Sequence, residues 1–538
     1  MKILFLYPNH EGYFRCPVGL TLVMTVCANA GHEVKLFDTT FMNVADNADS
    51  KIREKIGIVK PIPVDHFFNK QSKSQIETNW LKTIEEFKPD VIGTTILEDS
   101  YQYCDRLLGL AKNKFKVFTV AGGSMPTIVP QVIIENPNVD FIVEGEAEVA
   151  FVELLKNLKN KTSLSAVPNL WHKEDGKVIK NPLVKYLNMD EIPDQRLEFW
   201  DDKHFQKPYD GKLYTTGFFE TSRGCMHKCH YCINRAFQVF QADAGLVRRN
   251  KSVNRIMEEI GKAHKERNFG LIQFTDDNFL ARQPKELDEF FERWKKEINV
   301  PYWMNTCIET VNDQNLPQLK ESGCVGIGIG METGSDWVRQ HLLLKGKMSN
   351  DFYMEKFALI AKYGIRSTSN SMIGIPGEYE EDFFETVKLN KAIREINKDL
   401  TSFNICFMAP YMGTVIHNIA YEMGLIEVHD KPGFKGMCTA NITIRREPIM
   451  KNPCMTKERI IELFEDFHDY LTGKKEIPEK YLKSDPLRRY TNNDEIYSLY
   501  EKYKKGPIDP ALIKPKKEPA LIKTNSSIPS GELSGTQA

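Results

Sequence analysis

Apolar and polar residues follow each other along the first 150 residues in a regular order of strand-like and helix-like segments. Short apolar runs bounded by Gly, Pro or Asp predict strands at residues 2–7, 33–37, 91–95, 117–121 and 141–143. Helical spacing of apolar residues predicts helices at residues 19–30, 80–87 and 101–112. Strands that alternate with helices form a parallel sheet with right-handed crossovers, so we predict an α/β, doubly wound (Rossmann-like) domain over residues 1–150.

This predicted sheet has one edge suited to a ligand. Doubly wound sheets bind ligands at the carboxyl ends of their strands. The loops at that edge are residues 8–12, 94–100, 122–127 and 144–146. We therefore expect a binding site there.

A second series of strands and helices follows residues 151–215, a Pro-containing stretch that we interpret as a linker. Its strands are predicted at residues 218–221, 271–275, 302–307, 326–331, 367–373 and 403–408. Six repeats over residues 216–425 predict a partial barrel, short of the eight that close one. Residues 426–505 predict a helical C-terminal region, and residues 506–538, rich in Pro, Lys and Ser, predict a disordered tail.

Composition narrows the classes of function. The chain has 538 residues and a formal net charge of −1, which suits two or three domains and gives no electrostatic support for a nucleic-acid or membrane-surface partner. No apolar run is long enough to span a bilayer. The short apolar stretch at the N-terminus has no small-residue cleavage site, so we expect a cytoplasmic protein without a signal peptide.

Three of the eleven cysteines form a motif. An odd count argues against a disulfide framework, and scattered cysteines such as Cys27 and Cys406 suit packing. Cys225, Cys229 and Cys232, by contrast, follow directly on the first predicted barrel strand. Three thiolates at this spacing can hold an iron–sulfur cluster with one iron left open for a substrate.

Zinc is the alternative for these cysteines. His227 or His230 could complete a closed four-ligand zinc site. Structural zinc sites usually pair two CxxC knuckles, and the sequence contains no second one. The aromatic Tyr231 before the last cysteine is also not explained by zinc.

The CxxxCx(aromatic)C motif after a barrel's first strand resembles the signature of the radical S-adenosylmethionine (SAM) superfamily. Further landmarks of that family resemble segments of this chain in the same order. They are residues 274–279 (FTDDNF), 330–335 (GMETGS, with Thr333 replacing a Ser), 374–378 (GIPGE) and 410–414 (PYMGT, with Met412 replacing a Pro). The resemblance covers residues 220–425.

The resemblance implies cofactors and roles for residues. A [4Fe–4S] cluster on the three cysteines would bind SAM through its open iron and cleave it reductively, with electrons from a low-potential donor such as flavodoxin or ferredoxin. Tyr231 would border SAM, Asp277 would accept a hydrogen bond from its amine, and Glu332 would bind its ribose. Ser371 and Ile373, on an apolar strand, would flank the adenine.

The N-terminal domain resembles the cobalamin-binding (B12-binding) domain that precedes some radical SAM barrels. Gly122, Gly123, Ser124, Glu144 and Gly145 match the cobalamin-contacting loops, where small residues leave room for a macrocycle. The chain lacks the Asp-x-His-x-x-Gly motif that supplies a histidine ligand in other cobalamin proteins.

Three alternatives concern this domain. His10 lies close to where a histidine ligand would come, although a histidine in such a loop is more often solvated or hydrogen-bonded. The domain could have lost cobalamin and serve only as a lid. Cys16, Cys27 and Cys104 could hold a second cluster, but Cys27 and Cys104 lie inside predicted amphipathic helices.

The function expected from these features is a cobalamin-dependent methyltransferase that acts on an unactivated carbon of a small molecule, lipid or peptide. The alternative is a radical SAM cyclase, rearrangement or carbon–carbon coupling enzyme that does not methylate. An Fe–S or cobalamin sensor is the alternative without catalysis.

Overall fold

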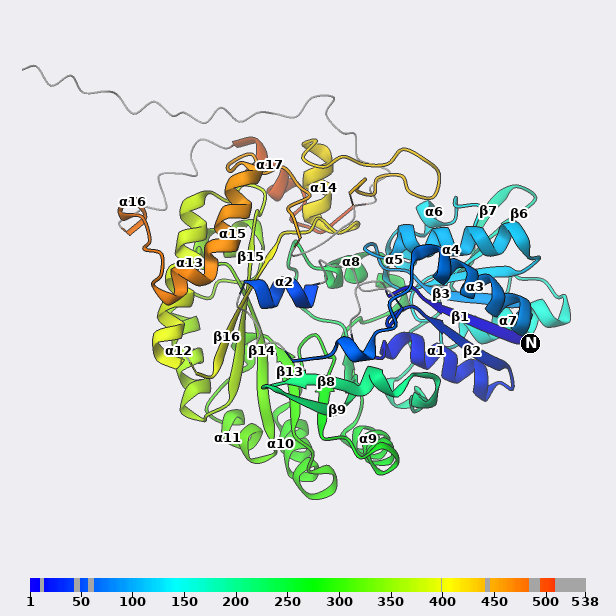
Figure 1. The fold of residues 1–538 in the computed structure, drawn as a ribbon, viewed down its shortest axis with the longest axis horizontal. Helices are drawn as coiled ribbons and strands as arrows, with labels where there is room; N and C mark the ends of the chain where they lie inside the picture. The colour runs from blue at the N-terminus through cyan, green and yellow to red at the C-terminus, as the bar shows by residue number, and fades with distance from the viewer. Residues whose placement is uncertain are drawn as a thin grey trace, which may run out of the picture.

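The computed structural model describes residues 1–9, 14–42, 49–56, 62–397, 399–440, 446–482 and 494–508. It contains two seven-stranded sheets, each covered by helices (Figure 1). The first sheet lies on the right in Figure 1 and the second on the left. The prediction for His10 and most of the predicted disordered tail fall outside the described residues.

The first sheet has the order β2-β1-β3-β4-β5-β6-β7. β1 to β5 are parallel, whereas β6 and β7 form an antiparallel hairpin at the edge. The strands are β1 (Lys2–Tyr7), β2 (Glu33–Asp38), β3 (Val91–Thr95), β4 (Phe118–Gly122), β5 (Phe141–Val143), β6 (Leu170–Glu174) and β7 (Lys177–Lys180). The order 2-1-3-4-5 is that of a doubly wound fold, in which ligands bind where the strand order reverses. The doubly wound prediction is confirmed.

The second sheet has the order β16-β15-β14-β13-β12-β9-β8. Its strands are β8 (Gln206–Tyr209), β9 (Lys212–Phe219), β12 (Leu271–Phe274), β13 (Tyr302–Thr306), β14 (Cys324–Glu332), β15 (Arg366–Ile373) and β16 (Thr401–Phe407). The six strands from β9 to β16 are parallel, and β8 is antiparallel to β9. This open sheet confirms the prediction of a partial barrel.

Residues 151–215, interpreted as a linker, contribute to both sheets. They supply the hairpin β6–β7 to the first sheet, and β8 with the start of β9 to the second. The first barrel strand therefore begins at Lys212, several residues before the expected start at residue 218. β9 starts earlier because its first residues pair with β8, whereas only its later residues pair with β12.

The helices cover both sheets. Those of the first unit are α1 (Val18–Asn29), α2 (Asp49–Lys55), α3 (Lys73–Phe87), α4 (Tyr101–Lys114), α5 (Ser124–Ile128), α6 (Pro130–Ile133) and α7 (Ala150–Asn160). Those of the barrel are α8 (Ile233–Phe240), α9 (Val253–Arg267), α10 (Pro284–Arg293), α11 (Asn315–Glu321), α12 (Asn350–Lys362), α13 (Glu380–Asn397) and α14 (Val415–Glu422). The C-terminal region adds α15 (Lys457–Thr472), α16 (Glu479–Leu482) and α17 (Asp494–Lys502).

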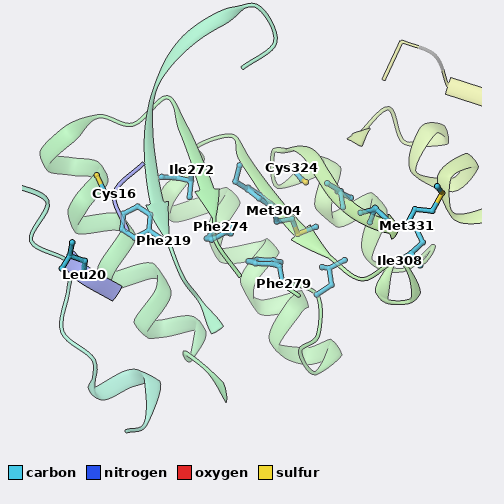
Figure 2. Packing of buried hydrophobic residues seen from close by; sticks show 14 of the residues in the cluster. Cys16, Leu20, Phe219, Ile272, Phe274, Phe279, Met304, Ile308, Cys324 and Met331 are labelled. Atoms are coloured by element: carbon cyan, nitrogen blue, oxygen red, sulfur yellow. The ribbon is translucent and has the colours of Figure 1, made fainter. Parts of the chain in front are cut away.

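The two units share buried side chains. One continuous cluster joins Leu20 and Cys16 of the first unit to Phe219 and Ile272 of the barrel (Figure 2). It continues past Met304 toward the far strands. Because burial of apolar surface is the main force that holds elements together, this shared core sets the position of one sheet against the other.

The C-terminal region packs against both the barrel and the first unit. Phe464 of α15 stacks on Phe407 of β16 with ring centroids 4.2 Å apart. Phe434 stacks on Tyr101 of α4, whose hydroxyl donates to the Gly433 carbonyl oxygen at 2.8 Å. Of the helices in the described ranges, none combines the length and apolar character that a membrane crossing requires.

Gly334 yields a test of the barrel packing. A Cβ at Gly334 would lie 2.6 Å from the Thr386 Cα of α13, whereas a Cβ at Gly19 of α1 would meet nothing within 4 Å. We expect Gly334→Ala to lower the free energy of unfolding by about 1–3 kcal/mol, as overpacking does. Gly19→Ala should leave it unchanged or raise it by up to about 1 kcal/mol. Urea denaturation of both variants measures the difference, and equal stabilities would contradict this packing.

Candidate active site

The cysteine loop is fixed to the end of the neighbouring barrel strand. Asp276, buried after β12, accepts hydrogen bonds from the Thr221 amide at 3.0 Å and the Thr221 hydroxyl at 2.7 Å. The Ser222 hydroxyl also donates to it. A buried carboxylate needs such donors, and these three hold the loop at the carboxyl edge of the barrel.

Arg223 connects the same loop to the first unit. Its guanidinium donates to Glu220 and to Glu148, both at 2.7 Å, and lies 3.1 Å from Glu146. Burial raises the pKa of Glu148, but the charge of Arg223 more than compensates, so the net pKa lies below its usual value. The two glutamates that follow β5 therefore hold the cysteine loop against the first sheet.

The three motif cysteines line this loop with their thiols unpaired by disulfides. Burial raises the pKa of Cys229, and it raises that of Cys232 to about 12. All three thiols interact electrostatically with one another. Within the described ranges, no four-ligand group gathers around one point here, whereas a four-iron cluster spreads its cysteines over different irons. Of the three motif cysteines, Cys225 alone belongs to a group in the described ranges whose ligand atoms converge on one point.

His230, considered as a zinc ligand, is used elsewhere. Its Nδ1 lies 2.9 Å from the Leu342 carbonyl oxygen, and its ring stacks on Tyr500. Its amide donates to the Leu343 carbonyl oxygen at 2.9 Å. His230 therefore anchors the loop to the segment after β14.

Cys307 is a site residue that the sequence analysis left among the scattered cysteines. Its sulfur, that of Cys225 and a ring nitrogen of His227 lie within 4.8 Å of one another. A hydrogen bond from the Cys307 thiol lowers the pKa of Cys225 to about 6 and raises that of Cys307. The signal available in the sequence was its position at the carboxyl end of the third barrel strand, where ligand-binding residues occur.

The two adjacent aspartates differ in role. Asp276 is buried and saturated by the loop, whereas Asp277 is exposed and bonded to Asn234. Asp277 also interacts electrostatically with Cys225 and Cys232. It is thus the carboxylate that remains accessible beside the cysteines.

Tyr231 and Glu332 meet at a third residue that the sequence analysis missed, Lys345. The Tyr231 hydroxyl donates to Glu332 at 2.9 Å, and the Lys345 ammonium lies 3.2 Å from both side chains. Burial alone would lower the pKa of Lys345, but its contacts with the Tyr231 hydroxyl and the Glu332 carboxylate raise it well above its usual range. Lys345 also interacts with Cys229, so a permanent positive charge borders the cysteines.

Glu332 adopts an unusual backbone conformation. Its φ is +71°, in the left-handed region, and a bulge interrupts the pairing of β14 with β15 at this point. A Cβ at Gly330 would collide with its carboxylate and lie 3.2 Å from the Lys345 ammonium. Such strain is common at functional sites, where a side chain must be aimed in a specific direction.

Ser371 and Ile373 lie on β15 with their side chains turned toward the helices. The Ser371 hydroxyl accepts a hydrogen bond from Asn390 of α13 at 3.1 Å, and Ile373 is fully buried in the shared core. Met372, between them, faces the opposite side. A ligand on the inner face of β15 would therefore meet their backbone and the Met372 side chain.

The residues expected to contact cobalamin lie together at the carboxyl edge of the first sheet. Gly122 and Ser124 are partly exposed, and a Cβ at Gly122 would come no closer than 4.0 Å to a neighbouring atom. Glu144 is instead engaged within the protein: it accepts from Gln241 at 2.7 Å and from Trp171 at 2.5 Å. Of this set, Gly122 and Ser124 leave the most room for a ligand.

Two glycines of the set serve close backbone contacts. Gly123 has a φ of +101°, and a Cβ there would lie 2.6 Å from the Thr95 hydroxyl. A Cβ at Gly145 would lie 2.6 Å from the Gln241 side-chain oxygen. The prediction that these two glycines leave open space is wrong, because protein atoms already occupy it.

Glu98 carries an unused polar atom at the same edge. Its Oε2 accepts from the Met412 amide at 2.7 Å, but its buried Oε1 has no partner among the described residues. Burial raises the pKa of Glu98 to about 8. Such an orphaned atom suits a ligand with amide groups, as cobalamin has.

Helix α8 brings the two candidate sites together. It begins directly after Cys232 and ends beside Gly145, where Gln241 binds Glu144. Gly413, at the carboxyl edge of the barrel, packs against Ile128 of α5 and Phe240 of α8. The ligand-binding edges of the two sheets therefore face each other.

Comparison with protein families identifies two matches. The model of the radical SAM superfamily matches residues 219–389, and that of the B12-binding domain matches residues 67–155. The first spans the barrel with the cysteine loop, and the second spans the carboxyl edge of the first sheet from β3 onward.

Relatives of this chain align with it over most of its length. An uncharacterized methyltransferase of Pyrococcus horikoshii is 27% identical over 71% of this chain and 78% of its own. The anaerobic magnesium-protoporphyrin IX monomethyl ester cyclase of Rubrivivax gelatinosus is 22% identical over 81% of this chain and 74% of its own.

A solved structure shares the fold. The radical SAM methyltransferase TsrM from Kitasatospora setae, with cobalamin and a [4Fe–4S] cluster bound, superimposes with a TM-score of 0.57 at 16% identity over 82% of this chain and 83% of its own. A second TsrM structure holds tryptophan substrate and a SAM analogue.

The matched domains define the cofactors. A radical SAM domain implies a [4Fe–4S] cluster and SAM, and a B12-binding domain implies cobalamin. The open cysteine loop and the edge around Gly122 and Glu98 fit these groups. The chain thus carries a radical SAM domain and, before it, a B12-binding domain, the two domains that its sequence predicts.

Proposed function

We propose that this protein is a cobalamin-dependent methyltransferase that acts on an unactivated carbon of a small molecule, lipid or peptide. The observation that carries the proposal is the opposition of the two carboxyl edges across α8. When bound, SAM and the cluster supply a carbon radical, and cobalamin supplies a methyl group. In this proposal residues 1–150 bind cobalamin and residues 216–425 bind the cluster and SAM.

The cysteine loop would hold the cluster. Cys225, Cys229 and Cys232 are the proposed ligands, and the Asp276 and Arg223 contacts keep the loop in place. A low-potential donor such as flavodoxin or ferredoxin is the proposed source of electrons.

SAM would bind between charged groups of opposite sign. Asp277 would bind the SAM amine, and Lys345 would bind the SAM carboxylate. Both side chains lie beside the cysteines, and each has the charge opposite to that of the SAM group it would bind. Glu332 and Tyr231 would border the ribose, and the β15 backbone at Ser371 and Ile373 would flank the adenine.

Cobalamin would lie against Gly122, Gly123, Ser124 and the backbone of Glu144 and Gly145. Glu98 joins this set because its Oε1 lacks a protein partner among the described residues. The macrocycle would then face α8 and the cysteine loop.

A cyclisation or other reaction without methylation is the second candidate. A relative named as a cyclase supports it: the alignment with this relative covers 81% of the chain, and 22% of the aligned residues are identical. Transfer of the SAM methyl group to an acceptor distinguishes the two.

Iron content tests the ligand assignment. Anaerobically reconstituted protein should bind about four irons with sulfide, and Cys225→Ala, Cys229→Ala or Cys232→Ala should each abolish this. Cys27→Ala and Cys406→Ala serve as packing controls and should keep the iron. One equivalent of zinc without sulfide would contradict the assignment.

SAM binding tests Lys345. Loss of a charge-assisted hydrogen bond costs about 1.5–3 kcal/mol, so Lys345→Met should weaken SAM binding about tenfold or more without changing iron content. Asp277→Ala and Glu332→Ala should weaken it as well. Lys347→Met, an exposed lysine two residues away, is the matched control. Normal SAM affinity in Lys345→Met would remove this residue from the site.

Methyl transfer tests the function itself. SAM with a deuterated methyl group, incubated with the reduced holoenzyme and a cell extract, should give products heavier by the labelled methyl, detected by mass spectrometry. Gly122→Trp should block cobalamin uptake and this transfer but preserve SAM cleavage, because its side chain would enter the open edge. Gly19→Trp, at an exposed position of α1, is the control. Labelled transfer by a cobalamin-free protein would exclude the proposed role of cobalamin.

A further inference from the structure

One group of metal-binding side chains at the cysteine loop differs from the proposed cluster ligands. The sulfurs of Cys225 and Cys307 and a ring nitrogen of His227 lie within 4.8 Å of one another. In the described ranges, no other set of three Cys, His, Asp or Glu side chains brings its ligand atoms this close together. Cys229 and Cys232 lie outside the group, although they belong to the same loop. Cys225 is therefore shared between two possible sets of ligands.

The three ligand atoms are spaced nearly as a single metal ion requires. Zinc binds thiolates at about 2.3 Å and imidazole nitrogens at about 2.0–2.1 Å, so the ligand atoms of a tetrahedral site are roughly 3.3–3.8 Å apart. Atoms that already lie within 4.8 Å of one another reach this spacing by small rotations of their side chains. The group can thus close around one ion without a change in the fold.

His227 is oriented by a carboxylate. Its Nε2 lies 3.2 Å from the side chain of Glu309. A histidine that binds a metal almost always donates the N–H of its other ring nitrogen to a carboxylate or carbonyl group. The pair of His227 and Glu309 has this arrangement, and with the proton on Nε2 the lone pair of Nδ1 is available to a metal.

The backbones of the ligands are held in place from two sides. Gln238 of α8 donates to the carbonyl oxygens of Cys225 and His227, at 2.5 and 2.9 Å. The Cys307 amide, just after β13, donates to the Asn278 side-chain oxygen at 3.1 Å. Because these contacts fix both segments, binding of a metal costs little further ordering of the chain.

The group is accessible from solvent. The side chains of His227 and Glu309 are 29% and 32% exposed. Both residues line a cavity of about 530 Å³, together with the exposed Met226. A hydrated ion therefore has a path to the group, which a metal site in a folded protein requires.

The donor atoms select the metal. Two thiolates and one imidazole suit zinc, whereas magnesium and calcium prefer oxygen ligands. Nitrogen and sulfur donors also bind Zn²⁺ more tightly than Fe²⁺. Three protein ligands leave the fourth position of a tetrahedral zinc ion for water. A single Zn²⁺ is thus the ion that this group fits best.

We propose that the cluster-free protein binds one Zn²⁺ through Cys225, His227 and Cys307, and that this ion and the cluster exclude each other because both need Cys225. Two Zn–S bonds and one Zn–N bond replace three waters of the ion, the thiol protons go to solvent, and no oxidation state changes. The inference goes beyond the proposed function, since it concerns the protein before its cluster is assembled. The supply of zinc would then limit how much of the protein acquires a cluster.

Zinc binding to cluster-free variants tests the site. Full-length protein is freed of iron with a chelator, and Zn²⁺ is titrated anaerobically against a chromophoric competitor. The wild type should bind one Zn²⁺. Glu309→Gln should weaken this binding about 10–100-fold, as loss of a carboxylate behind a histidine ligand does. Cys307→Ala and His227→Asn should weaken it further still, because each removes a ligand. Cys229→Ala and Cys232→Ala are the matched controls and should keep the zinc, the reverse of their expected effect on iron.

Cluster assembly tests the exclusion. One equivalent of Zn²⁺, added before iron and sulfide, should lower the iron content that the wild type reaches. The same zinc should have no effect on Cys307→Ala, which should bind about four irons. His227→Asn should behave in the same way, and this partly exposed residue keeps the test independent of the packing around Cys307.

The proposal makes three claims that can fail separately. Absence of zinc binding by the wild type, or equal zinc affinity in Cys307→Ala, would overturn it. Zinc that depends on Cys229 or Cys232 would overturn it as well, and so would equal iron uptake by zinc-loaded and zinc-free wild type. Absence of labelled methyl transfer by a protein with the expected zinc pattern would instead reject the proposed function and leave the zinc site standing.

Discussion

The position of the cysteine loop depends on one buried ionic contact. Arg223, whose side chain is 15% exposed, lies between Glu220 of its own strand end and Glu146 and Glu148 of the first unit. A buried guanidinium left without its carboxylates would be costly, so the loop and the carboxyl edge of the first sheet stay together. The proposed transfer between the two cofactors depends on this contact, because it requires the cluster site and the cobalamin site to lie close together.

The two faces of the barrel sheet have different roles: the outer face packs into the core, and the inner face carries polar groups. Its outer face and the first unit share one apolar core, which holds the two sheets in a fixed relation. Its inner face and carboxyl edge carry charged and amide groups that the fold does not need for packing. β14 shows this at one point: Glu332 has a strained backbone, and Gly330, two residues before it, lacks the side chain that would collide with the Glu332 carboxylate.

The lysine at the carboxyl edge and the lysine at the inner face differ in the charge of their bonded partners. Lys345 forms an ion pair with Glu332 and lies beside Cys229, so the ion pair fixes the position of its ammonium next to the cysteines. Lys207 has cationic neighbours and a neutral amide as its bonded partner.

The sequence by itself determined the two sheets, the cysteine motif and the order of the landmarks. Period-two and helical patterns, together with Gly and Pro at the ends of elements, are local signals, and they located β1, β3 and β5 with the observed bounds. Only the tertiary structure decided which polar residues meet. Lys345 joins Tyr231 from 114 positions away, and Cys307 joins Cys225 from another strand. The prediction for Gly123 and Gly145 was wrong because the atoms that fill their space come from distant segments, Thr95 at the end of β3 and Gln241 at the end of α8. Contacts between distant segments depend on how the sheets pack, and no local pattern encodes that packing.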